Sequence, residues 1–491
     1  MKNFILLISF IVCVSIVSDA QTSYEDFKKK SSQDIESFRD ISKKNYESFR
    51  KKANDDYANF LKKSWKNYNA LKSPINEDKT PSPPIIYDNN PIKDESKPIK
   101  KVIPPPTPSP QPSPIEPIKE IPEEDKWLSF RFYGANLKVR IDNRHKFYIG
   151  TLSKQNISTA WSSLSSNRYN NVINDCLNIR KKHNLCDWAY LLMIKKLSES
   201  FAGEGSNEAT LLMAYIYCQS GYKMKLAYEG NQLYMLYASK HHIYNLKYFY
   251  VDGANFYPLG FNGNSLNICQ ASFPNEQALS LYIFNLPNIG EANSKYRDLQ
   301  SNRYKSANAT ISINSNLIDF YNTYPTSEID NNFMTRWAMY ANAPLSDEAK
   351  NTLYPAMRLA IDGVSQLEAA NRILNFVQTA FDYEYDNKVW GEDRAFFADE
   401  TLFYPYSDCE DRSILFSRLI RDLLGLDVVL VYYPGHLATA VHFTTDVRGD
   451  NFTYDGKKFV ICDPTYINAL VGATMPQFRG CRDISVILLD K

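Results

Sequence analysis

Large apolar side chains recur every eleven residues over 24–71. One series is Tyr24, Ile35, Tyr46, Tyr57 and Tyr68, and a second is Phe27, Phe38, Phe49, Phe60 and Leu71. Eleven residues per three turns is about 3.67 per turn, so both series fall on one face of a helix. The other faces are rich in Lys, Asp, Glu and Asn. We predict a helical segment over 21–72 that self-associates as a coiled coil or docks on a partner; the alternative is a solvated, frayed helix.

Proline dominates the next stretch, 73–125, which holds most of the chain's 25 prolines. Runs such as Pro104-Pro105-Pro106 favour extended polyproline conformations and bury no core. We therefore predict a disordered linker that holds the C-terminal module away from the N-terminal helix.

Folded sequence resumes at Trp127, and a helix–glycine–strand–strand pattern then occurs twice. Setting Gly221 of the first copy against Gly425 of the second aligns the hydrophobic positions of both, with few identities. This alignment matches Cys409 with Gly205 and His436 with Gln232. Our hypothesis is that the first copy is a degenerate version of the second; chance similarity is the alternative.

Cys409 lies at the start of a predicted helix. Leu415, Leu419 and Leu423 form an apolar stripe, Ser407 or Asp408 can cap the start, and Gly425 ends the helix. The first turn favours a thiolate, and its N–H groups can donate to a developing oxyanion. The neighbouring Asp408, Glu410 and Asp411 act in the opposite direction, because negative charge raises the pKa of a thiol.

Three strands are predicted after this helix: Leu426 to Tyr433, His436 to Phe443, and Lys457 to Asp463, with a polar loop at 449–456. An antiparallel register of the last two strands that pairs His436 with Asp463 also pairs His442 with Lys457. His436 thus meets a carboxylate and His442 does not. We predict Cys409 as nucleophile, His436 as base, and Asp463 as the group that fixes the histidine tautomer.

These motifs resemble the core of bacterial transglutaminase-like domains, which share a papain-like Cys-His-Asp core. The resemblance covers about 350–480 and rests on Tyr404 to Ser413, Pro434-Gly435-His436, Cys462 to Tyr466 and the preceding helix Ala369 to Tyr383. It implies an α+β fold, in which the nucleophile helix packs on an antiparallel sheet, and acyl transfer through a thioester. One departure is Leu437, where the family often has an aromatic residue. Trp390 and Tyr404 are candidates for the second oxyanion donor only through their proximity in sequence.

The first twenty residues read as a secretory signal, with Lys2, the apolar run Phe4 to Val17 and the small residues Ser18 and Ala20. We expect an exported protein (periplasmic, cell-surface or secreted) without an integral membrane segment after cleavage. Lipid attachment at Cys13 is disfavoured, because Cys13 lies inside the apolar run. The predicted organisation is a signal peptide (1–20), a repeat helix (21–72), a disordered linker (73–125), an α+β domain (126–290), a connecting region (291–345) and a catalytic domain (346–491).

Composition narrows the remaining choices. A net charge of +1 gives no field that favours nucleic acid, and six histidines argue against a metal site. The odd number of cysteines beyond Cys13 indicates a free thiol. No acidic loop has calcium-binding spacing, so no cofactor is expected. The predicted function is a cysteine peptidase or amidase acting on a protein or peptide, with cell-wall peptide as one option. A crosslinking transglutaminase and a non-catalytic surface scaffold are the alternatives.

Overall fold

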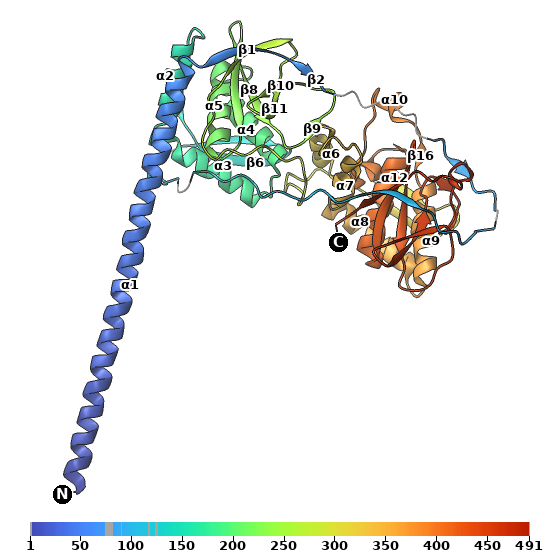
Figure 1. Ribbon diagram of the computed structural model, residues 1–491, viewed down its shortest axis with the longest axis horizontal. Helices are drawn as coiled ribbons and strands as arrows, with labels where there is room; N and C mark the ends of the chain where they lie inside the picture. The colour runs from blue at the N-terminus through green and yellow to red at the C-terminus, as the bar shows by residue number, and fades with distance from the viewer. Residues whose placement is uncertain (1, 74–81, 90, 116–117, 123–125, 491) are drawn as a thin grey trace.

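A long helix, α1 (Lys2–Leu61), projects from a body made of two α+β lobes (Figure 1). The computed structural model describes residues 2–73, 82–89, 91–115, 118–122 and 126–490. The C-terminal end of α1 is docked on the N-terminal lobe, where Tyr57 and Leu61 are buried. There the Asn54 side chain bonds to Gln219 at 3.1 Å and accepts from the Trp161 indole at 3.1 Å. One end of the repeat helix is therefore anchored in the body.

The predicted helix over 21–72 is too long at its C-terminal end. The chain leaves α1 at Leu61 and enters the strands β1 (Trp65–Asn69) and β2 (Leu71–Lys72). Tyr68, a member of the eleven-residue series, lies on β1 and donates its hydroxyl to Gln270 at 2.7 Å. The edges of the N-terminal sheet offer backbone partners to both strands, and this tertiary pairing overrides the helical pattern.

The N-terminal lobe packs helices against one mostly antiparallel sheet. Its helices are α2 (Lys154–Leu164), α3 (Asn170–Lys182), α4 (Asp187–Ala202) and α5 (Asn207–Gln219). The sheet order is β1, β12 (Ser265–Cys269), β7 (Met224–Glu229), β8 (Gln232–Ala238), β11 (Ala254–Pro258), β10 (Lys247–Val251) and β2. A separate hairpin, β5 (Trp127–Phe132) and β6 (Ala135–Arg140), forms just after the Pro-rich segment.

The region between the lobes is mixed, with short helices and two-stranded pairs. It contains β13 (Arg297–Gln300), β14 (Asn308–Ile311), α6 (Ser315–Tyr321), β15 (Ser327–Glu328), which pairs with β9 (His242–Ile243), and α7 (Thr335–Asn342). Its helix α7 packs against the C-terminal lobe and brings Arg336 to the start of α12.

The C-terminal lobe places a central helix on a six-stranded sheet. Its helices are α8 (Asp347–Ile361), α9 (Gln366–Thr379), α10 (Asp386–Val389), α11 (Ala398–Phe403) and α12 (Cys409–Leu424). The sheet order is β20 (Asn451–Tyr454), β21 (Lys457–Cys462), β19 (His436–His442), β18 (Asp427–Tyr433), β23 (Ile484–Leu488) and β4 (Ile99–Ile103). Two small pairs are β16 (Asp382–Tyr383) with β17 (Tyr406–Ser407), and β22 (Tyr466–Ile467) with β3 (Ile85–Ile86).

The two large sheets repeat one topology. The order β12-β7-β8-β11-β10 matches β23-β18-β19-β21-β20, and every neighbouring pair in both series is antiparallel. In each lobe the helix before the first hairpin, α5 or α12, packs on that hairpin. The hairpins close with Glu229 opposite Gln232 and with Tyr433 opposite His436. The repeated connectivity supports the hypothesis of an internal copy.

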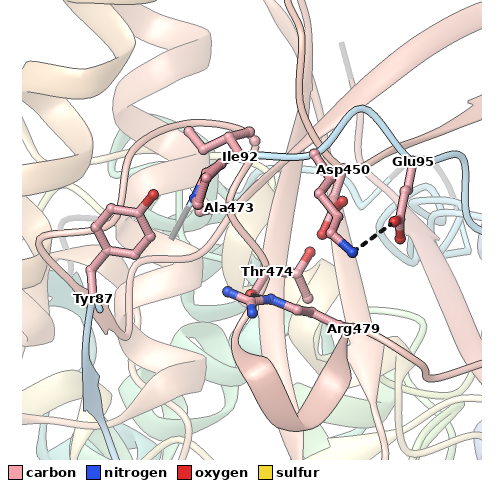
Figure 2. Close-up of a pocket in the computed structure, with 10 residues that line it drawn as sticks. Tyr87, Ile92, Glu95, Asp450, Ala473, Thr474 and Arg479 are labelled. Carbon is pink, nitrogen blue, oxygen red and sulfur yellow. Dashed lines mark hydrogen bonds and ion pairs between the residues drawn. The ribbon is translucent and has the colours of Figure 1, made fainter. Parts of the chain in front are cut away.

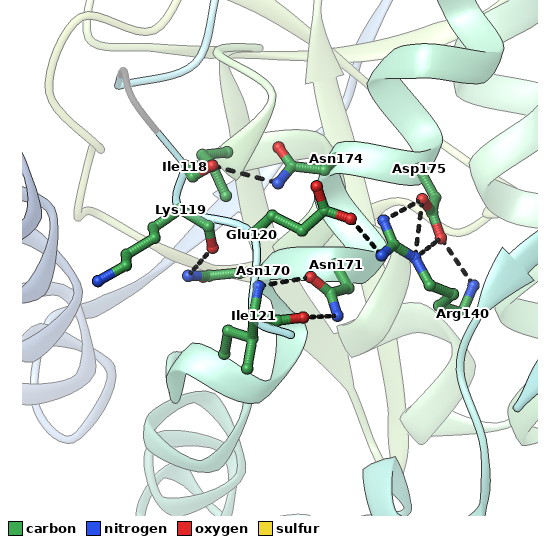
Figure 3. Close-up of polar contacts among 9 residues, drawn as sticks. All are labelled: Ile118, Lys119, Glu120, Ile121, Arg140, Asn170, Asn171, Asn174 and Asp175. Atoms are coloured by element: carbon green, nitrogen blue, oxygen red, sulfur yellow. Dashed lines mark hydrogen bonds and ion pairs between the residues drawn. The ribbon is translucent and has the colours of Figure 1, made fainter. Parts of the chain in front are cut away.

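The Pro-rich segment differs from the prediction, because its described part is packed rather than disordered. β4 extends the C-terminal sheet in parallel with β23, and β3 pairs with β22. Farther along, the side-chain amides of Asn170, Asn171 and Asn174 donate to the carbonyls of Lys119, Ile121 and Ile118 at 2.9, 2.9 and 3.1 Å (Figure 3). Short isoleucine-containing stretches between the prolines form edge strands, where proline is tolerated. The segment therefore lies against both lobes.

Candidate active site

Helix α12 begins where the sequence predicts and places Cys409 in its first turn. The Asp408 carboxylate accepts from the Glu410 N–H at 2.9 Å, and the Asp411 carboxylate accepts from the Asp408 N–H at 3.1 Å. This reciprocal capping fixes the helix start. Gly425, with φ 64°, ends the helix. As the first helical residue, Cys409 has a backbone N–H without an intrahelical acceptor, which can donate to an oxyanion.

His436 and Asp463 form the predicted pair. His436 Nε2 lies 2.9 Å from Asp463 Oδ2, and both side chains are buried. The His436 ring stacks on Phe478 with centroids 5.1 Å apart, while Gln378 donates to the Asp463 carbonyl at 3.0 Å. These contacts fix the ring and the loop that carries the carboxylate. Within the described part of the chain, His436 Nδ1 is buried without a hydrogen-bond partner, and so it is free to take a proton.

The strand register differs from the predicted one by two residues. Thr439 faces Cys462 and Ala440 faces Ile461, so His436 and Asp463 are not directly opposite, and His442 packs on Phe459 instead of facing Lys457. The predicted loop 449–456 contains β20, which pairs tightly with β21 and changes where the strands meet. Because a shift of two keeps every side chain on its own face, His436 still reaches Asp463.

Cys409 meets this pair at the start of β19. The backbone N–H of Leu437, the residue after His436, lies near enough to the Cys409 sulfur to lower the pKa of the thiol. Burial raises the pKa of Cys409 well above its ordinary value, and the charges of Asp408, Glu410 and Asp463 add to this effect. The structure therefore packs the helix that Cys409 begins against the strand that begins with His436, in a state that favours the neutral thiol.

Buried carboxyl groups surround the nucleophile. Burial raises the pKa of Asp408 to about 6, that of Glu410 to about 8 and that of Asp386 to about 11. Arg336 partly compensates, because its guanidinium contacts Glu410 at 3.0 Å. Carboxyl groups that keep their protons near neutral pH place less negative charge beside the sulfur.

Tyr383 is the aromatic residue that sequence reasoning missed. Its pKa is raised by burial and then by the charges of Cys409 and Asp408, so its phenol lies within electrostatic range of the nucleophile. The Tyr383 hydroxyl donates to the carbonyl of Ser82 at 3.2 Å. Tyr383 is the last residue of the stretch 369–383 that resembles the family. No sequence pattern predicts that its side chain lies near Cys409.

The two predicted oxyanion candidates lie in a separate aromatic cluster. The Tyr404 hydroxyl donates its hydrogen bond to Asn322 at 3.0 Å, and not to a group at Cys409. The Trp390 ring packs edge-on against Tyr404 at 4.9 Å and carries the guanidinium of Arg394 at 4.5 Å. These contacts indicate a structural role for both residues, and Tyr383 replaces them as the aromatic side chain beside the nucleophile.

Comparisons with protein-family models, curated proteins and solved structures find no match for this chain. Across the described ranges, no group of three or more His, Cys, Asp or Glu side chains is arranged to hold a metal ion. No helix in those ranges has the length and apolar character needed to cross a bilayer. The seven cysteines from Cys176 to Cys481 are free thiols, and six of them are buried.

Proposed function

We propose that this chain is an exported thiol acyl-transfer enzyme of the transglutaminase-like type, a cysteine peptidase or amidase that works through a thioester. One observation carries the proposal. His436 Nε2 lies 2.9 Å from Asp463, its Nδ1 has no hydrogen-bond partner among the described residues, and the strand that His436 begins packs against the helix that Cys409 begins. A nucleophile, a base and a group that orients the base are the parts that acyl transfer requires.

The reaction follows from these three groups. His436 Nδ1 takes the Cys409 thiol proton, and the sulfur attacks the carbonyl carbon to form a tetrahedral oxyanion near the Cys409 N–H. When the oxyanion collapses, the carbon–nitrogen bond breaks and His436 returns its proton to the leaving amine. Water then attacks the thioester while His436 takes a proton from it, and the carbon–sulfur bond breaks to restore the thiol. Asp463 stabilises the imidazolium in both halves.

Two alternatives share parts of this site. A crosslinking transglutaminase differs only in the second half, where an amine replaces water. A non-catalytic scaffold is favoured by the 2% exposure of Cys409 and by its raised pKa, since a scaffold needs no reactive thiol.

Iodoacetamide labelling of Cys409 against pH, followed by peptide mass spectrometry, separates an activated thiol from an inert one. We expect the apparent pKa for labelling to lie below the ordinary thiol value of about 8.5 when solvent reaches the site. His436→Ala should move it to that value or above. His442→Ala is the matched control, because His442 lies on the same strand with its Nδ1 at the Lys458 carbonyl. A profile that is identical in all three proteins would favour the scaffold.

A further inference from the structure

One segment of the Pro-rich region, Ser82–Asp88, crosses the candidate active site; we call it the strap. The Ser82 N–H donates to the Gly435 carbonyl at 3.0 Å, directly before His436. The Ser82 carbonyl accepts from the Tyr383 hydroxyl at 3.2 Å, and the charge of Cys409 acts on that phenol. Ser82 therefore lies between the residues that flank the base and the nucleophile.

The strap continues as an added strand past Asp463. Ile85 and Ile86 pair in parallel with Tyr466 and Ile467 of β22, which follows Asp463 closely in the chain. The Tyr87 N–H extends this ladder to the Ile467 carbonyl at 2.8 Å. The Tyr87 ring packs edge-on against Tyr466 with centroids 5.4 Å apart. The strap thus makes backbone bonds at both ends of the site.

The strap contacts the C-terminal lobe in the same way that an extended peptide binds in a groove. Main-chain hydrogen bonds to a sheet edge supply affinity, and alternate side chains supply specificity. The Ile85 side chain packs on the core of the C-terminal lobe, whereas Ile86 is 72% exposed. A phenol that donates to a backbone carbonyl beside a cysteine is also what would hold a substrate carbonyl.

We propose that the groove between Gly435, Tyr383 and β22 is the binding site for an extended peptide, and that the strap occupies it as an internal ligand. This inference rests on the proposed function and names its substrate class. The bound peptide would present a carbonyl to Tyr383, an inward aliphatic side chain at the place of Ile85, and an aromatic one at the place of Tyr87. A peptide substrate has to displace the strap, and in this arrangement Cys409, His436 and Asp463 are each 2% exposed.

The chain that follows the strap borders a pocket before Asp94 and Glu95 bond to Asn451 of the lobe. A pocket of about 280 Å³ lies between Tyr87, Ile92 and Glu95 on the strap side and Asp450, Thr474 and Arg479 of the lobe (Figure 2). Asp88 of the strap accepts from the Tyr466 hydroxyl at 3.3 Å and lies 3.9 Å from Arg479. Farther on, Lys97 is fixed by Asp450 and by the Arg479 carbonyl, so release of the strap need not detach β4.

The test uses the full chain and two ways to loosen the strap. Ser82→Pro removes the N–H that bonds to Gly435, and Ile85→Ser/Tyr87→Ala removes the two inward side chains. Ile86→Ser is the matched control, because its side chain points outward. Cys409 labelling is measured at a pH where an ordinary thiol ionises. Binding of a fluorescent peptide with the sequence of residues 82–89 is measured by anisotropy in the same variants carrying Cys409→Ala.

We expect Cys409 to label at least about tenfold faster in both loosened variants, because iodoacetamide then reaches the thiol without waiting for the strap to detach. Labelling of Ile86→Ser should not change. The peptide should bind the loosened proteins and restore protection. Unchanged labelling in variants that keep a native circular dichroism spectrum would overturn the inference. Faster labelling without peptide binding would also overturn it, since the strap would then be only a cover. Both readouts require access and binding but no activated thiol, so they stay separate from the test of the proposed function.

Discussion

The two lobes share a sheet topology and differ at the start of one helix. Cys409 begins α12, where the Leu437 N–H lowers the pKa of its thiol, while Asn207 begins α5 and accepts the Leu233 N–H at 2.8 Å. Leu233 follows Gln232 as Leu437 follows His436, so equivalent backbone N–H groups face a thiol in one lobe and bond to an amide in the other. The helix starts correct the predicted match of Cys409 with Gly205 to a match with Asn207, whereas the match of His436 with Gln232 agrees with the hairpin registers.

What surrounds the equivalent positions explains the different chemistry. Asn207 and Gln232 satisfy local carbonyls, those of Asn231 at 3.0 Å and Gly205 at 3.4 Å, and this closes the helix start with neutral hydrogen bonds. In the C-terminal lobe a long insertion, 380–408, separates α9 from α12, whereas only 203–206 separate α4 from α5. That insertion supplies Tyr383 and part of the buried acidic group. The proposed site therefore combines Cys409, His436 and Asp463 with an insertion that the N-terminal lobe lacks.

The largest expected effect comes from removing the nucleophile. Cys409→Ser should lower hydrolysis of an activated ester such as p-nitrophenyl acetate on the order of 10⁴-fold in a strap-loosened protein, since the hydroxyl is a far weaker nucleophile. Asn207→Ser, at the equivalent place, should leave the rate unchanged. Equal losses in both variants would mean that the two lobes are not distinguished by their chemistry.

Grafting the nucleophile and base into the N-terminal lobe tests whether the insertion matters. We expect Asn207→Cys/Gln232→His to give a thiol that labels with an ordinary pH profile and adds no measurable ester hydrolysis, because this lobe has no counterpart of the 380–408 insertion. The profile is read in a Cys409→Ala background by mass spectrometry of the peptide that carries residue 207. A lowered apparent pKa in this graft would show that topology alone suffices.

The sequence predicted much of the C-terminal site because its signals are local. Capping residues and an apolar stripe define α12, and β-branched runs define β18 and β19, so the neighbourhood of Cys409 and His436 follows from short-range chemistry. A register error of two residues did not move side chains between faces, and the His436–Asp463 contact survived it.

Long-range placements could not be predicted in the same way. The strands β1, β3 and β4 lie in sequence that reads as helix or as Pro-rich linker, and each forms only because an exposed sheet edge offers partners from far along the chain. Tyr383 reaches Cys409 through the path of the insertion. Such contacts depend on tertiary geometry, which no period or motif encodes.

The acidic group beside Cys409 predicts a pH-dependent stability. The folded-state pKa of Glu410 is about 8, above its unfolded value of about 4.3, so its contribution is fully present at low pH and is lost as pH rises from about 4.3 through 8. We expect the Tm to fall over this range and Glu410→Gln to reduce the fall by several degrees. The control is Glu208→Gln at the same place on α5, in which Tm should depend on pH as it does in the wild type. If Tm in Glu410→Gln also falls with pH as in the wild type, other groups cause the pH dependence.

The smallest expected effects concern the ends of the equivalent helices. Gly425 after α12 has φ 64°, and a Cβ added there would meet no atom within 4 Å, so Gly425→Ala should cost only about 1 kcal/mol of unfolding free energy, from the left-handed conformation. Gly221 after α5 has φ 93°, and a Cβ there would lie 2.2 Å from the Ser113 carbonyl oxygen. Gly221→Ala should therefore cost more, about 2–4 kcal/mol, and should loosen the Pro-rich segment from the N-terminal lobe. Urea denaturation compares the two variants, and proteolysis near residue 113 reports the loosening. Equal costs would mean that Ser113 yields easily, and that the segment is held by the asparagine contacts to Lys119 and Ile121 instead.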